Sequence, residues 1–81
     1  MPKKDVVTAE EEPKRIGQEY TRWIIKVNGY VRGTVERFNP APGEEHPYKA
    51  FHRSRMLGVF YVSEHGRHAK QKAIDAVIGA A

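Results

Sequence analysis

Seven basic side chains recur along residues 22–60, a stretch whose alternating polar and apolar residues predict short β-strands. They are Arg22, Lys26, Arg32, Arg37, Lys49, Arg53 and Arg55. Only three acids, Glu36, Glu44 and Glu45, fall in the same stretch. A sheet that gathers such cations on one face suits an extended polyanion, because each neutralised phosphate releases counterions. These residues are therefore predicted to form a nucleic-acid-binding surface.

Arginine outnumbers lysine among these cations, which favours a specific anion partner. The planar guanidinium can bridge phosphate oxygens, or guanine O6 and N7, in a way that an ammonium group cannot. Cations on exposed strands also prevent sheets from aggregating edge to edge, so the same pattern is typical of an ordinary solvated face. The scarcity of acids on the same strands favours the first interpretation.

Two aromatic residues are candidates for stacking on a base or for contacting a protein partner, Tyr30 and Phe51. If Ala50 points into the core, then Lys49, Phe51 and Arg53 form a stripe of cation, aromatic and cation on the outer face. If Phe51 points inward instead, that stripe is lost. Trp23 lies in the apolar phase of its strand and is expected to belong to the core.

The sequence predicts no catalytic residues, no metal site and no cofactor, so an enzyme is not expected. Ser54 and Ser63 have no recognisable histidine and carboxylate partners, and no glycine-rich phosphate loop is present. His52, His65 and His68 could bind zinc only if the fold brought them together, and no cysteine or acidic ligand spacing supports such a site.

The chain has 81 residues, which suits one small domain and favours a binding module over an enzyme with a deep pocket. It contains no cysteine, and no apolar run approaches the roughly 20 residues that span a bilayer. We therefore expect a cytoplasmic protein without a membrane partner or a small-molecule substrate.

The charge is unevenly distributed along the chain. Residues 1–19 hold four cations and five acids, whereas residues 20–81 hold ten cations and five acids. Residues 1–19 have few aliphatic residues and no sustained hydrophobic periodicity, so they are predicted to be a disordered charged tail. Residues 20–81 are predicted to form the single folded domain.

A hairpin is predicted around Asn28-Gly29, the strongest short-range turn signal in the sequence. A two-residue turn would mix Trp23 and Ile25 with polar residues on one face. A three-residue turn, residues 27–29 with a bulge at Gly29, places them with Val31, Gly33 and Val35. Arg22, Lys26, Arg32 and Thr34 then share the other face, so we choose this register.

The remaining elements follow from breaks in the pattern. Three prolines and Gly43 in residues 39–47 end the second strand near Phe38. Further strands are predicted over residues 48–54 and 56–62, with a tight turn near Ser54-Arg55. Ser63 is a candidate N-cap for a helix over residues 64–78 with an alanine-rich buried face. The predicted fold is α+β, an antiparallel β-meander of three to four strands with one C-terminal helix packed on one face.

Three segments carry a resemblance to a known group of DNA-binding domains. They are Tyr30-Val31-Arg32-Gly33-Thr34-Val35-Glu36-Arg37, Tyr48-Lys49-Ala50-Phe51 and Leu57-Gly58-Val59-Phe60, followed by the alanine-spaced helix. This order resembles the three-stranded-sheet domains of plant ethylene-response factors and the arm-site-binding domains of some tyrosine recombinases. The resemblance implies that the sheet enters the major groove of DNA. It also implies contacts to bases and phosphates from Arg32, Arg37, Lys49 and Arg53.

The sequence departs from that group in an added first strand at residues 23–27, a longer loop at residues 39–47, and the lack of a tryptophan in the second matched segment. The predicted function is a duplex-DNA-binding module, an accessory or regulatory protein of a phage or mobile element. Arg32 and Arg37 are the expected central contacts. The alternative is a small protein-binding module or inhibitor that acts through the sheet face or an edge strand.

Overall fold

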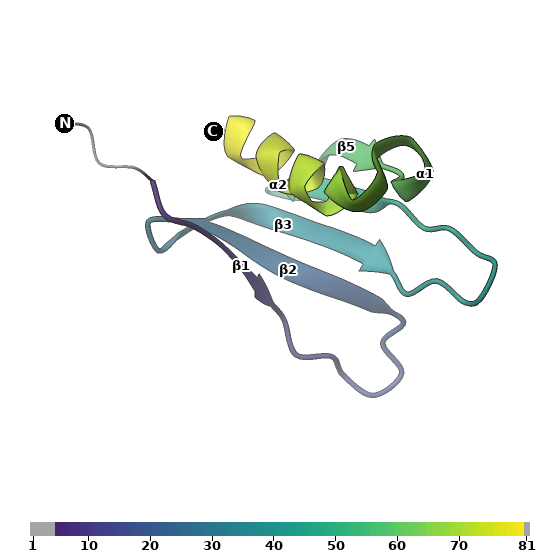
Figure 1. Ribbon diagram of the computed structural model, residues 1–81. Helices are drawn as coiled ribbons and strands as arrows, with labels where there is room; N and C mark the ends of the chain where they lie inside the picture. Colours follow the sequence, from purple (N-terminus) through teal and green to yellow (C-terminus); the bar gives the residue numbers. More distant parts are fainter. Residues whose placement is uncertain (1–4, 81) are drawn as a thin grey trace.

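A computed structural model of the protein describes residues 5–80 as a five-stranded antiparallel sheet with one helical layer (Figure 1). The strands are β1 (Val7–Glu11), β2 (Tyr20–Val27), β3 (Tyr30–Phe38), β4 (Tyr48–His52) and β5 (Arg55–Phe60), and they lie in the sheet in sequence order. The helical segment comprises α1 (Val62–His65), the 3-10 turn η1 (Gly66–His68) and α2 (Ala69–Gly79). The predicted α+β meander with its C-terminal helix is confirmed, with five strands in place of three to four.

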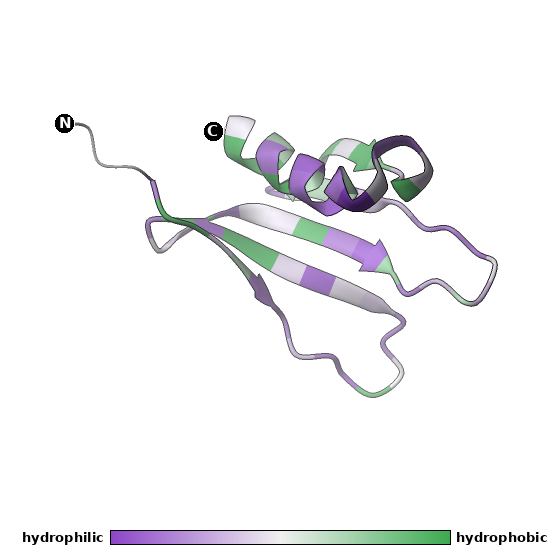
Figure 2. Ribbon diagram, viewed as in Figure 1, coloured by the Kyte–Doolittle hydropathy of each residue, from purple (hydrophilic) through white to green (hydrophobic). Residues whose placement is uncertain are grey.

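The core lies between α2 and one face of the sheet. Alternate residues of β2, β3 and β4 point toward α2, which agrees with the period of two along a strand. Hydrophobic and hydrophilic bands alternate along α2 and the central strands (Figure 2). The buried cluster consists of Ile25, Val35, Ala50, Ala73, Ile74 and Val77. Trp23 packs at its border, as predicted, and the opposite face of the sheet, here called the outer face, has no helix over it.

The β2–β3 hairpin differs from the prediction in the position of its bulge. Asn28 and Gly29 both have positive φ, 53° and 84°, and Val27 pairs with Tyr30 across a two-residue turn. This conformation suits the twist of the two strands, and Asn-Gly adopts it readily. The predicted three-residue turn is therefore wrong, and Val27 is buried instead of lying in the turn.

The extra residue lies within β3. Ile25 pairs with Gly33, but Lys26 pairs with Val31, so Arg32 is left without a partner in β2. The predicted grouping of Trp23 and Ile25 with Gly33 and Val35 is thus correct. Val31 does not join them, because the bulge changes the phase of the strand, and its side chain is 63% exposed.

The predicted disordered tail is wrong for Val7–Glu11, which form the edge strand β1 beside β2. All five residues are exposed, so the sequence carries no pattern of buried apolar residues that would predict a strand here. Backbone pairing to β2 and acid–base pairs hold it in place, and such non-local contacts are not visible in local composition. Residues 1–4 of the predicted tail lie outside the described range.

The helical segment also begins differently from the prediction. Gly66, the C-cap of α1 and the first residue of η1, has φ 58°, so the predicted helix over residues 64–78 is interrupted there. Ser63 does not act as the N-cap; the α1 N-cap is Tyr61, and the Ser63 amide donates a hydrogen bond to Glu45 Oε1 at 2.7 Å. No helix within residues 5–80 is long and apolar enough to cross a bilayer.

Candidate nucleic-acid interface

A groove of about 650 Å³ lies on the outer face over β3 and β4. Its lining comes from Arg22, residues 31–34, Glu36 and residues 51–54. Ala50 is fully buried, so Lys49 and Phe51 point to the outer face, and the first of the two orientations considered for this strand is correct. The groove therefore joins an aromatic ring to the cations of the neighbouring strands.

Arg32 lines this groove at the position of the β3 bulge. The bulge leaves Arg32 unpaired with β2 and exposed. On the other side, the Arg32 carbonyl accepts a hydrogen bond from His52 Nδ1 at 2.8 Å. Because a carbonyl only accepts, His52 must carry a proton on Nδ1. His52, which the sequence offered only as a possible zinc ligand, instead ties the backbone of Arg32 to the end of β4.

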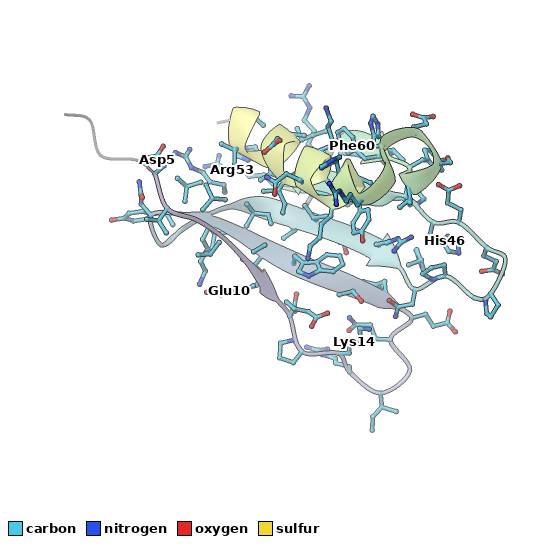
Figure 3. All side chains as sticks on the ribbon, viewed as in Figure 1. Asp5, Glu10, Lys14, His46, Arg53 and Phe60 are labelled. Atoms are coloured by element: carbon cyan, nitrogen blue, oxygen red, sulfur yellow. The ribbon has the colours of Figure 1, made fainter. Side chains whose placement is uncertain are left out.

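Arg53, in the β4–β5 turn, lines the same groove. Figure 3 labels this residue. Arg53 and Ser54 have φ values of 49° and 66°, the left-handed region that residues other than Gly, Asn and Asp rarely adopt. A conformation of this kind stores strain, and such residues cluster at functional sites. The β2–β3 turn at the same end of the sheet consists of Asn28 and Gly29, which adopt positive φ with little strain. Of these two turns, the β4–β5 turn at Arg53-Ser54 is therefore the strained one.

Replacing Ser54 by glycine is expected to stabilise the protein by about 0.5–1 kcal/mol, because it removes the left-handed strain at a small cost in chain entropy. The contrasting variant is Gly29→Ala, which introduces that strain at φ 84° where a Cβ meets no other atom. It should destabilise by about 1 kcal/mol. Urea unfolding of both variants provides the measurement, and equal midpoints would contradict a strained turn.

The two predicted cations of β2 are paired with carboxylates. Arg22 Nη2 lies 2.9 Å from Glu36 Oε1, and Arg22 Nη1 lies 3.4 Å from Glu12 Oε2. Lys26 Nζ lies 2.9 Å from Glu10 Oε2. The hydrogen bonds that Arg22 donates to Glu36 raise the pKa of the guanidinium above its ordinary value, although burial acts in the opposite direction. The predicted face of unopposed cations is therefore wrong over β2.

Arg37 lies on the face that α2 covers. It pairs with Thr21, two residues along from the Trp23–Val35 pair, and so shares the orientation of Val35. Its Nε donates to the His46 carbonyl at 2.8 Å, and its guanidinium lies 4.7 Å from the Tyr48 ring centroid. Its expected place beside Arg32 at the centre of one surface is wrong, because five residues separate the two, β3 pairs regularly from Gly33 to Arg37, and residues an odd number apart on a regular strand face opposite sides.

The remaining predicted residues occupy three positions. Lys49 is on the outer face, opposite Glu36 and Val59, with Nζ 5.9 Å from the Phe38 ring centroid. Arg55 is exposed at the start of β5, next to the turn that holds Arg53. Tyr30 is 77% exposed beside the β2–β3 turn and does not line the groove.

The outer face thus divides into two halves of different electrostatic character. Over β1 and β2, carboxylates balance the cations. At the end of the sheet that includes β3, β4 and the β4–β5 turn, no ion pair among residues 5–80 involves Arg32, Lys49 or Arg53. Arg55 has no ion pair among these residues either, but it pairs with His52, next to the outward-facing Phe51–Met56 pair, and so lies beside the turn and not on the outer face. Anion binding is therefore favoured at this end.

Other kinds of site were sought in the same part of the chain. No group of three or more metal-ligating side chains occurs within residues 5–80, so His52, His65 and His68 do not come together there. The sequence reasoning placed Thr34 on this face correctly, but it missed the carboxylate partners of β2. Of these partners only Glu36 was within reach, because the register that pairs Trp23 with Val35 also places Arg22 opposite Glu36.

Comparisons with models of protein families, with curated proteins and with solved structures return no match for this chain. The assignment of function therefore rests on the geometry of the groove.

Proposed function

We propose that the protein binds duplex DNA through the groove and the adjoining β4–β5 turn. Two arginines from different parts of the chain converge on one groove, Arg32 at the bulge of β3 and Arg53 in the left-handed β4–β5 turn. That convergence is the observation that carries the proposal. Neither guanidinium has a carboxylate partner among residues 5–80.

The roles within this interface follow from the side chains. Arg32 and Arg53 bind phosphates or guanine edges, since a guanidinium can form two parallel hydrogen bonds to either. Lys49 and Arg55 add phosphate contacts beside them. Phe51 supplies an apolar surface to sugars or bases. The resemblance to sheet-face DNA readers supports the same use of the surface, and a regulatory or accessory role in the cytoplasm of a host cell is consistent with it.

The experiment is a titration of fluorescently labelled duplex DNA at about 50 mM and about 200 mM salt. Four phosphate contacts, one each from Arg32, Lys49, Arg53 and Arg55, predict a slope near −3.6 for the logarithm of affinity against the logarithm of salt, from about −0.9 per contact. Affinity should then fall about 100-fold between the two salt concentrations. A slope near zero would contradict the proposal.

A second candidate function, a protein-binding module or inhibitor, is favoured by the apolar side chains left exposed at one edge of the sheet. Met56 and Val59 of the edge strand β5 are 52% and 37% exposed, and Val31 is 63% exposed. A partner protein would add a strand to β5 or cover the outer face. A duplex titration without any response would favour this candidate.

A further inference from the structure

Two carboxylates from the N-terminal edge of the sheet hold two cations of the outer face. Glu10 of β1 reaches Lys26, and Glu12, the next residue but one, reaches Arg22. Arg22 also lines the groove. Glu10, labelled in Figure 3, pairs across the sheet with Ile24 and projects to the face opposite α2. These carboxylate oxygens occupy the sites on Lys26 and Arg22 that phosphate oxygens would otherwise take.

The segment that carries these carboxylates has little burial to hold it. Every residue of β1 is exposed, and none of the buried core residues comes from this strand. Its attachments are the ladder to β2, a backbone hydrogen bond from Glu12 to Arg22, and the hydrogen bonds between Val6 and Asn28 at the turn. Segments with few buried contacts open at a small fraction of the global unfolding free energy. The carboxylates can therefore exchange for another anion without loss of the core.

We propose that residues 10–12 form an acidic strap that competes with nucleic-acid phosphates for Lys26 and Arg22. This inference rests on the proposed DNA binding. With the strap in place, binding uses the end of the sheet that holds Arg32 and Arg53. When the carboxylates are displaced, the interface extends across β2.

Displacement of the strap carboxylates frees Lys26 and Arg22 to different extents. Lys26 has one carboxylate partner among residues 5–80, Glu10, so the loss of that partner leaves its ammonium group available for a phosphate. Arg22 keeps Glu36 at 2.9 Å after Glu12 leaves, so its gain is smaller. The decisive variant is therefore Glu10→Gln, which removes the charge and keeps the shape of the side chain.

The strand supplies its own control. Glu11 lies between the two strap carboxylates, but it pairs with Trp23 and therefore points to the other face of the sheet. No ion pair within residues 5–80 involves Glu11. Glu11→Gln changes the net charge by the same amount as Glu10→Gln, and it should release no cation of the outer face.

The test is a duplex-DNA titration of the full chain, its E10Q variant and its E11Q variant, over a series of salt concentrations. E10Q is expected to bind about five- to tenfold more tightly at about 50 mM salt, with a salt slope steeper by about 0.9, because one further phosphate contact forms. E11Q should change affinity less than twofold and leave the slope unchanged. Thermal unfolding confirms that both exposed substitutions leave the fold intact.

Three other outcomes would overturn the proposed strap, either alone or together with the proposed DNA binding. If the unaltered chain binds duplex and E10Q gains no more than E11Q, the strap is wrong and DNA binding stands. If E10Q and E11Q gain equally with unchanged slopes, the effect is one of net charge only and the strap is again wrong. If neither the unaltered chain nor E10Q binds, the proposed function fails and the strap with it.

Discussion

Replacing Arg32 and Arg53 together by glutamate is expected to weaken duplex binding at least about 100-fold, equivalent to about 2.7 kcal/mol. Each substitution removes a phosphate contact and places a carboxylate next to the DNA backbone. The salt slope should become shallower by about 1.8, because two contacts are lost. Both side chains are exposed, so the substitutions remove no core packing. Fluorescence anisotropy with labelled duplex measures both quantities.

The matched control reverses two cations on the helical side of the molecule, Arg67 of η1 and Lys72 of α2. Both are exposed, and α2 packs on the face of the sheet opposite the groove. The variant R67E/K72E therefore has the same net charge as R32E/R53E. It should lose less than about fivefold in affinity. An equal loss in the two variants would show that overall charge, and not the groove, governs binding.

Replacing Gly33 by alanine is expected to destabilise the fold by about 3 kcal/mol or more, the upper range for overpacking a core. A Cβ at this position would collide with the Phe51 carbonyl oxygen and lie 2.8 Å from Val77 Cγ1. Here β3 lies beside β4 in the sheet, and α2 packs over both strands. The carbonyl belongs to the backbone of the neighbouring strand and cannot move without breaking the pairing of Thr34 with Phe51. For a domain of this size, such a loss is a large part of the total stability.

Gly79 at the end of α2 provides the contrast. A Cβ there meets no atom within 4 Å. Gly79→Ala should be neutral or stabilise by up to about 1 kcal/mol, since alanine has the higher helix propensity. Chemical denaturation of both variants measures the difference. Similar stabilities would contradict the close approach of β3, β4 and α2 on which the shape of the outer face depends.

Local sequence patterns were sufficient to predict much of the fold. Asn28-Gly29 marked the hairpin, and the prolines of residues 39–47 marked the end of β3. The helical spacing of Ala69, Ala73 and Val77 marked the face that α2 buries. Each of these signals acts within a few residues, where the local backbone conformation depends on turn-forming residues and on the spacing of apolar residues.

The errors concern contacts between distant parts of the chain. Val7–Glu11 form a strand only because β2 offers an edge to pair with, and their own composition is typical of a tail. The bulge at Arg32 depends on the pairing of β2 with β3. Its position then decides that Val31 is exposed. The different faces of Arg32 and Arg37 need no bulge, because regular alternation alone separates residues an odd number apart.

The groove itself was partly accessible from the sequence. Lys49, Phe51 and Arg53 were foreseen as a stripe on the condition that Ala50 points inward, which it does. The neutralisation of Lys26 by Glu10 was not foreseen, because it requires β1 to be a strand. The site therefore shifts from the centre of the sheet toward the end that holds Arg32 and Arg53.

The most direct test of DNA binding is the duplex titration recorded on isotopically labelled protein at low and moderate salt. We predict chemical-shift changes concentrated on the backbone amides of Arg32, Phe51, His52 and Arg53, with an affinity that falls about 100-fold between about 50 mM and about 200 mM salt. Changes confined to α2, or no changes at the lower salt concentration, would contradict binding through the groove.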